Sequence, residues 1–191
     1  MNINDIIAAR LRSLRNERDW SLDALSDRSG VSRSNISLIE RGESSPTAIV
    51  LDKLAGALDV PLASLFQAQP SEKSPSPLAR AADQAVWTDP ASGYLRRHLS
   101  SAIPCPTQLV EIQFPAGQRV SYESVLQKPE VIQQVWMIRG LMDVRIGATT
   151  WQLKKGDCLT MKLDQPTTFH NPGDVTARYL VALTTPSRGE I

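Results

Sequence analysis

Two arginines and two serines share one side of a short predicted helix, where their side chains could bind nucleic acid. If Ile36 and Ile39 point into a helical bundle, the opposite side of that helix carries Arg33, Ser34, Ser37 and Arg41. A guanidinium can donate two hydrogen bonds to guanine in the major groove, and hydroxyls can bond to phosphates or base edges. The helix N-terminus also favours phosphate. This face therefore favours DNA contact, although an ordinary solvated helix face has the same composition.

Two short helices with clear start signals position this face. Ser21 can cap a helix over residues 22–29, Gly30 supplies a sharp turn, and Ser32 can cap the helix that follows. A helix, a glycine turn and a second helix form a DNA-docking unit, but a purely structural bundle fits these signals equally well. Apolar residues at helical spacing predict one helix before this pair and one after it: Ile7, Leu11 and Leu14, then Leu51, Leu54 and Leu58.

The chain changes character near residue 70. Residues 69–77 form a Pro/Ser-rich run that cannot build a core and indicates a linker. Short β-branched runs between glycines and prolines then predict strands at Gln108–Phe114, Val131–Arg139, Leu141–Ile146, Thr149–Leu153, Cys158–Leu163 and Ala177–Leu183. Since no helical crossovers separate them, a sandwich or barrel is favoured. We expect a helical domain at residues 1–68, a linker at 69–84 and an all-β domain at 85–191, an α + β chain of two domains.

The overall composition restricts the class of protein. The chain has 191 residues and a net charge of +1, which alone neither indicates nor excludes nucleic acid. No apolar run reaches eighteen residues and the N-terminus lacks the features of a secretory signal, so we expect a cytoplasmic protein with no membrane partner. Cys105 and Cys158 lack CxxC spacing, which argues against a disulfide framework and leaves a redox role open.

Several phrases in the first domain are typical of one DNA-binding family. Residues 32–42 are SRSNISLIERG, a Pro-Thr pair follows at 46–47, and LDVPL at 58–62 precedes Leu-Phe at 65–66. Through these phrases, residues 6–67 resemble the lambda-repressor-like (Xre/Cro) helix-turn-helix family. The resemblance implies a five-helix bundle whose helix from Ser32 enters the major groove of double-stranded DNA.

The same resemblance implies roles for individual residues. It places Arg33, Ser34 and Leu38 at base-facing positions, and Ser21, Asn35 and Arg41 near the phosphate backbone. With the helix-capping Ser32 and the exposed Ser37, these residues form the expected DNA-binding site. Arg15 and Glu40 are expected to form a structural ion pair. Two departures from the family pattern, Ser26 in place of an alanine and Ser29 in place of an apolar residue, are expected to weaken the packing slightly.

The helical domain is nearly neutral, which favours a dimer. Residues 1–68 contain eight Lys/Arg and nine Asp/Glu, so each monomer can neutralise few phosphates. Two recognition helices about 34 Å apart, held by the second domain, would read adjacent major grooves of a palindromic operator.

The second domain ends with signals that resemble a cupin motif. Gly156-Asp157 opens this segment and Asn171-Pro172-Gly173 closes it at the family's spacing, which implies a double-stranded β-helix barrel. In this chain, Thr167 and Gln133 stand at two positions where that family has metal-binding residues. Depending on the count, the two histidine slots fall on Glu123 and Val125 or within residues 126–129, and neither count finds a histidine.

These substitutions predict a cupin-like domain without metal, cofactor or catalytic residues. Neutral Gln and Thr side chains cannot replace imidazole and carboxylate ligands. The chain has two histidines: His98 is expected on an early strand or loop, and His170 on the face opposite to Thr167. If a bulge altered that register, Glu123 and His170 would be the remaining metal donors.

An apolar pocket with a few amide and hydroxyl groups would suit a small organic effector. The expected lining residues are Gln133, Val135, Met137, Thr167 and Phe169, with Tyr122 and Gln127. Trp136, Ile138 and Trp151 are expected on the other side, where they could cover a subunit interface.

Three functions stay open at this point. The first is a DNA-binding regulator whose barrel dimerises and binds an effector that changes the spacing of the recognition helices. The second is a regulator with a purely dimerising barrel, and the third is a cupin enzyme that carries a DNA-binding domain. We expect the first.

Overall fold

The computed structural model describes residues 3–66, 76–101, 103, 105–123 and 131–185. Four α-helices form the N-terminal bundle: α1 (Ile3–Asn16), α2 (Leu22–Ser29), α3 (Arg33–Glu40) and α4 (Ala48–Ala57). The apolar stripes predicted on α1 and α4 form its core, since none of their six members is more than 2% exposed. The sequence therefore located the helical core correctly.

The caps of α2 and α3 form as predicted. The Ser21 hydroxyl accepts a hydrogen bond from the Ala24 N–H at 3.0 Å, and the Ser32 hydroxyl accepts one from the Asn35 N–H at 3.3 Å. Between the two helices, Gly30 has a φ of +65°, a conformation that a side chain would strain. Ser29 is buried and hydrogen-bonded, donating to the Leu25 carbonyl at 2.7 Å, so its hydroxyl is satisfied within the helix.

The expectation of five α-helices is wrong for the described residues. The fifth segment, η1 (Leu62–Phe66), is a 3-10 helix. It follows Pro61 and has only five residues, and a 3-10 turn is a common form for so short a piece. A second 3-10 helix, η2 (Ala81–Asp83), lies within the segment expected to be a linker.

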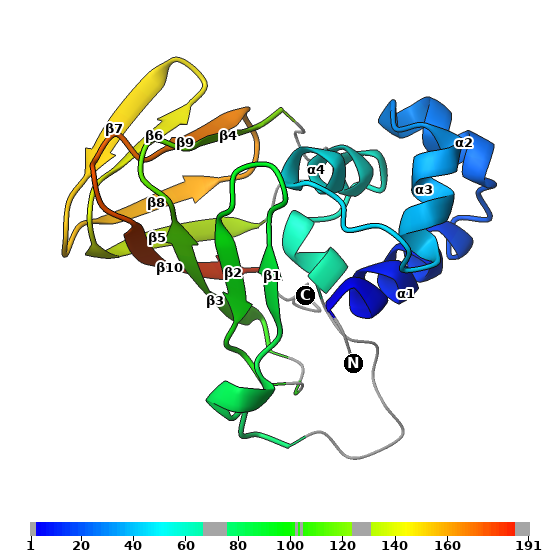
Figure 1. Cartoon of the computed structure of the whole chain (residues 1–191), viewed down its shortest axis with the longest axis horizontal. Helices are drawn as coiled ribbons and strands as arrows, with labels where there is room; N and C mark the ends of the chain where they lie inside the picture. The colour runs from blue at the N-terminus through cyan, green and yellow to red at the C-terminus, as the bar shows by residue number, and fades with distance from the viewer. Residues whose placement is uncertain (1–2, 67–75, 102, 104, 124–130, 186–191) are drawn as a thin grey trace, which may run out of the picture.

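Two antiparallel sheets make up the C-terminal domain (Figure 1). The larger has the order β1-β2-β3-β10-β5-β8 and the smaller β4-β9-β6-β7. All six expected strands are present: β3 (Thr107–Phe114), β5 (Ile132–Arg139), β6 (Met142–Ile146), β7 (Thr149–Leu153), β8 (Cys158–Lys162) and β10 (Ala177–Thr184). Four short strands were not predicted: β1 (Val86–Thr88), β2 (Leu95–His98), β4 (Arg119–Tyr122) and β9 (Thr167–His170).

Burial alternates along β5, which fixes its two faces. Val135 and Met137 are buried, whereas Trp136 between them is 49% exposed on the outer face, as expected. The expectation for Trp151 is wrong. Its register partner on β6 is the fully buried Val144, so Trp151 lies on the inner side of the smaller sheet, exposed because β7 is an edge strand.

The two domains pack directly against each other through α4 and η1 (Figure 1). The Ala48 N–H donates to the Asp89 carboxylate at 2.9 Å, in a buried hydrogen bond between the start of α4 and the β1–β2 turn. The Phe66 ring meets the Trp87 ring edge-on at 5.4 Å. This contact was not anticipated from the sequence, and it gives the β-domain a wall made of helical residues.

No helix in the described part of the chain is long and apolar enough to span a membrane.

Candidate nucleic-acid interface and ligand pocket

The outer face of α3 holds the side chains predicted to contact DNA. Ile36 and Ile39 are at most 1% exposed and anchor the helix to the bundle. The opposite side is exposed at Arg33, Ser34 and Leu38. Of the remaining predicted residues, Ser21, Ser32 and Arg41 are exposed, whereas Asn35 and Ser37 are half-buried. The structure therefore exposes six of the eight predicted residues and leaves the other two half-buried on α3.

Both arginines of this face already have acidic partners. The Arg33 Nε lies 3.1 Å from an Asp23 carboxylate oxygen. Arg41 donates to both Glu43 carboxylate oxygens, at 2.9 and 2.8 Å, and to the Ser37 hydroxyl at 2.7 Å. The hydrogen bonds from Arg41 lower the pKa of Glu43, and the same bonds raise the pKa of Arg41. Sequence reasoning missed these partners, although Glu43 is only two residues from Arg41.

Arg15 and Glu40 form the predicted ion pair between α1 and α3. The Arg15 Nε and Nη2 donate to the two Glu40 carboxylate oxygens at 2.7 and 2.8 Å. This hydrogen bonding raises the pKa of Arg15, and Arg12 also donates to the Glu40 carbonyl. Because Glu40 is buried, the pair fixes the end of α3 and hence the direction of its outer face.

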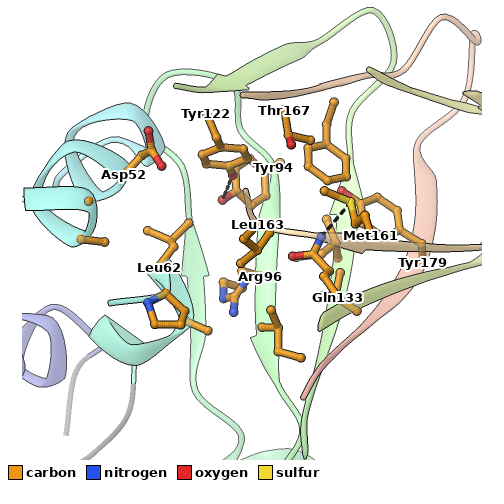
Figure 2. A pocket seen from close by; sticks show the side chains of 18 of the residues that line it. Asp52, Leu62, Tyr94, Arg96, Tyr122, Gln133, Met161, Leu163, Thr167 and Tyr179 are labelled. Carbon is orange, nitrogen blue, oxygen red and sulfur yellow. Dashed lines mark hydrogen bonds between the residues drawn. The ribbon is translucent and has the colours of Figure 1, made fainter. Parts of the chain in front are cut away.

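A cavity of about 100 Å³ lies between the inner faces of the strands and the α4–η1 segment (Figure 2). Residues of the helical domain that line it are Asp52, Ala55, Gly56, Val60, Pro61, Leu62 and Ala63. Those of the β-domain are Tyr94, Arg96, Ile112, Phe114, Tyr122, Gln133, Met161, Leu163, Gln165, Thr167, Phe169, Tyr179, Val181 and Leu183. The walls are thus mainly apolar, and both domains contribute to them.

Three tyrosines and one arginine are among the polar side chains of the cavity. The Tyr94 and Tyr122 hydroxyls are hydrogen-bonded at 2.9 Å. Burial raises the pKa of Tyr94 to about 12 and also raises the pKa of Tyr122 and Tyr179, so all three hydroxyls stay protonated. Burial lowers the pKa of the Arg96 guanidinium, which lies over the Phe66 ring at 4.9 Å from its centroid.

Four of the seven expected pocket residues line this cavity: Tyr122, Gln133, Thr167 and Phe169. Val135 and Met137 point to the same side of β5 but do not line it, which corrects the prediction. They are completely covered by the surrounding core, whereas Gln133 lies nearer the start of the strand. Gln127 lies outside the described residues.

The positions that resemble cupin metal slots carry neutral side chains. Gln133 and Thr167 both line the cavity. Glu123, which directly follows β4, is exposed to solvent. Val125 and residues 126–129 lie outside the described residues. His170 does not line the cavity, and its Nδ1 lies 3.6 Å from an Asp143 carboxylate oxygen. In the described ranges, no group of three His, Cys, Asp or Glu side chains could hold a metal ion.

An exposed helix-turn-helix face joined to a pocket-bearing β-domain defines the class of two-domain helix-turn-helix proteins. The helix-turn-helix family model HTH_3 matches residues 11–65. The HTH-type transcriptional regulator SutR of Escherichia coli (strain K12) is 30% identical over 182 residues, covering 93% of this chain and 94% of SutR. The chain therefore belongs to the family of HTH-type transcriptional regulators that includes SutR.

Further likenesses agree with this assignment. An uncharacterized HTH-type transcriptional regulator of Mycobacterium tuberculosis (strain ATCC 25618 / H37Rv) is 33% identical over 113 residues, 49% of this chain and 43% of that protein. The crystal structure of an HTH_3 family transcriptional regulator from Vibrio cholerae has a TM-score of 0.70 and 23% identity, covering 97% of this chain and 98% of that chain. The latter likeness shows that both domains share a fold with that protein.

Proposed function

We propose that this chain is a sequence-specific transcriptional regulator whose α3 enters the major groove and whose β-domain dimerises and binds a small effector. The observation that carries the proposal is the outer face of α3, where Arg33, Ser34 and Leu38 are exposed while the other side of the helix is anchored. In this arrangement these three residues contact base edges. Ser21, Asn35 and Arg41 contact phosphates. Ser32 caps the start of α3, and Ser37 accepts a hydrogen bond from Arg41.

The domain boundaries of the proposal are those expected from the sequence. Residues 1–68 bind DNA, 69–84 connect, and 85–191 form the effector and dimerisation domain, with the two sheets closing into a cupin-like barrel. Its function is non-enzymatic, because Gln133 and Thr167 offer neutral side chains where catalytic cupins hold metal ligands.

Selection from a random pool of double-stranded DNA tests the DNA-binding part of the proposal. We expect the full-length protein to retain a defined sequence with two symmetric half-sites about one helical turn apart. Arg139→Ala is a matched control, since it removes an exposed arginine of β5, outside the helical domain, and leaves selection unchanged. Absence of any site-selective complex at low ionic strength would overturn the regulator function.

The outer face of the larger sheet supports the dimer. Three large apolar side chains are exposed on this sheet: Trp136 and Ile132 of β5, and Leu109 of β3. Between these two strands lies β10, whose Leu180 is the register partner of Trp136. Tryptophan and other large apolar side chains are enriched in the buried centre of subunit interfaces. A second copy of the chain on this surface would place two α3 helices on one operator.

Sedimentation velocity tests this interface. Trp136→Glu puts a charge on the larger sheet, so we expect it to shift the protein from dimer to monomer. Trp151→Glu is the matched variant, because Trp151 is 39% exposed at the edge of the other sheet. Dissociation by Trp151→Glu alone would place the interface elsewhere, and a monomeric wild-type protein would exclude the dimer.

A further inference from the structure

Arg96 is a buried cation with two guanidinium nitrogens that lack a hydrogen-bond acceptor in the described structure. Its residue is 8% exposed, and its Nε and Nη2 have no hydrogen-bond acceptor in the described structure. A buried charged group is costly unless it is paired and hydrogen-bonded. The neighbouring Arg97 points to the other side of β2, where its Nε lies 3.7 Å from a Glu111 carboxylate oxygen. Of the two arginines of β2, Arg97 therefore has a carboxylate partner, whereas Arg96, which lines the cavity, has no ion pair in the described structure.

The surroundings of Arg96 suit an incoming anion. The Phe66 ring supports the guanidinium by a cation–π contact, which does not provide an acceptor for Nε or Nη2. Tyr94 and Tyr122 line the same cavity, and because one of their hydroxyls donates to the other, one O–H is left to donate a further hydrogen bond. The only carboxylate among the described lining residues is Asp52, which comes from α4 and accepts the Glu123 N–H at 3.1 Å (Figure 2).

We propose that this cavity binds a small organic oxyanion, a carboxylate or sulfonate with a short apolar body, whose charged end pairs with Arg96. The cavity of about 100 Å³ is smaller than one that holds benzene, so the body has only a few carbon atoms. Leu62, Met161 and Leu163 provide apolar contacts for it (Figure 2). The inference names the effector class and rests on the proposed function for its regulatory consequence.

The position of the cavity links the anion to the DNA-binding domain of the same chain. Leu62 and Asp52 belong to the helical domain and face Arg96 and Tyr94 of the β-domain across the cavity (Figure 2). An occupant therefore contacts both domains, and its binding energy depends on how α4 and η1 sit against the strands. By linkage, the anion shifts the orientation of α3 and changes the affinity for DNA.

Thermal unfolding of the full-length protein tests the anion. Sodium butyrate and sodium methanesulfonate are compared with neutral butyramide, at ionic strength matched with sodium chloride. We expect the two oxyanions to raise the melting temperature in proportion to the logarithm of their concentration, and butyramide to leave it unchanged. An equal rise with butyramide, or no rise with either oxyanion, would overturn the inference.

Three variants assign the response to Arg96. Arg96→Met keeps an apolar stem without the charge, so we expect a loss of affinity of about tenfold or more. Arg97→Met removes the same charge one residue along β2 and keeps the response. If Arg96→Met does not fold, Tyr122→Phe replaces it, with an expected several-fold loss from one missing hydroxyl. An unchanged response in the folded variant would overturn the assignment.

A DNA titration separates this inference from the proposed function. We expect butyrate or methanesulfonate to change DNA affinity in the wild-type protein and in Arg97→Met, but not in Arg96→Met. DNA binding that no oxyanion alters would overturn the regulatory link alone. An oxyanion response in thermal unfolding without any DNA complex would instead refute the regulator function and leave the anion site intact.

Discussion

Arg33, the first residue of α3, pairs with Asp23 of α2 across the helix-turn-helix unit. The Arg33 Nε lies 3.1 Å from the carboxylate oxygen, and both side chains are more than 60% exposed. The ion pair holds the guanidinium at the start of α3, on the surface proposed to face DNA. Because this pair uses Nε, the Nη1 and Nη2 groups can still reach a guanine, but the carboxylate places a negative charge beside the DNA.

Asp23→Asn should strengthen DNA binding. The substitution releases Arg33 and removes one negative charge close to the phosphates, whereas an exposed ion pair itself contributes little. We expect a gain of about 0.5–1 kcal/mol in binding free energy, measured by fluorescence anisotropy with the selected operator. Asp27→Asn, which removes the same charge one turn further along α2, is the control. An equal gain from both variants would mean that only net charge matters.

Arg33→Ala should weaken binding and relax specificity at one base pair. Loss of a bidentate guanine contact costs about 1–3 kcal/mol on the preferred sequence and less on sequences altered at that pair. Titrations with the operator and with the three other base pairs at each position measure the difference. An equal loss on every sequence would contradict base contact by Arg33 and favour a phosphate contact.

Arg41→Ala should weaken binding to all sequences alike. Arg41 is engaged by Glu43 and Ser37 in the free protein and is proposed to turn to a phosphate on DNA. Loss of one phosphate contact makes the plot of log affinity against log salt shallower by about one unit. Glu43→Gln is the reciprocal variant, which should make binding tighter. A sequence-dependent effect of Arg41→Ala would contradict a phosphate contact.

Local signals predicted the DNA-binding half of the molecule well. Ser21, Gly30 and Ser32 set the helix ends by hydrogen bonds within a few residues, so the sequence alone locates them. Ile36 and Ile39 then determine which side of α3 faces outward. Even the long-range pair of Arg15 and Glu40 was predicted, but from family resemblance rather than from spacing.

The cavity was predicted less completely because it depends on how the domains pack. The cupin-like motif spacing placed Gln133 and Thr167 in the pocket, and both line the cavity. Tyr94 and Arg96 were missed because β2 is four residues long and rich in charge, so its sequence lacks the apolar alternation of a strand. Nothing local shows that α4 and η1 cover the strands, and a linker near residue 70 suggested separate domains.

His98 should make the protein less stable at mildly acidic pH. Burial lowers the pKa of its imidazole below the ordinary value of 6.5, and the charge of Arg96 acts in the same direction. The unfolded chain therefore takes up this proton more readily than the folded one, so stability is full above pH 6.5 and falls as pH decreases towards the folded-state pKa.

Urea unfolding between pH 7.5 and pH 5 measures this decline, at about equal ionic strength throughout. His98→Gln removes the titrating group and should flatten the curve in this window. His170→Gln keeps His98 and should leave the decline in place. A decline of the same steepness in His98→Gln would assign it to other groups.

Phe66→Ala should destabilise the junction between the domains. Phe66 is 3% exposed, meets Trp87 edge-on at 5.4 Å and supports Arg96, so truncation leaves a cavity and uncovers a buried cation. We expect a loss of about 3–5 kcal/mol in the free energy of unfolding, measured by urea titration. Phe66→Leu retains most of the apolar volume and should lose about 1.5 kcal/mol or less. If Phe66→Ala cost no more than Phe66→Leu, the ring would not bridge the two domains, and the helical wall of the cavity would be absent in solution.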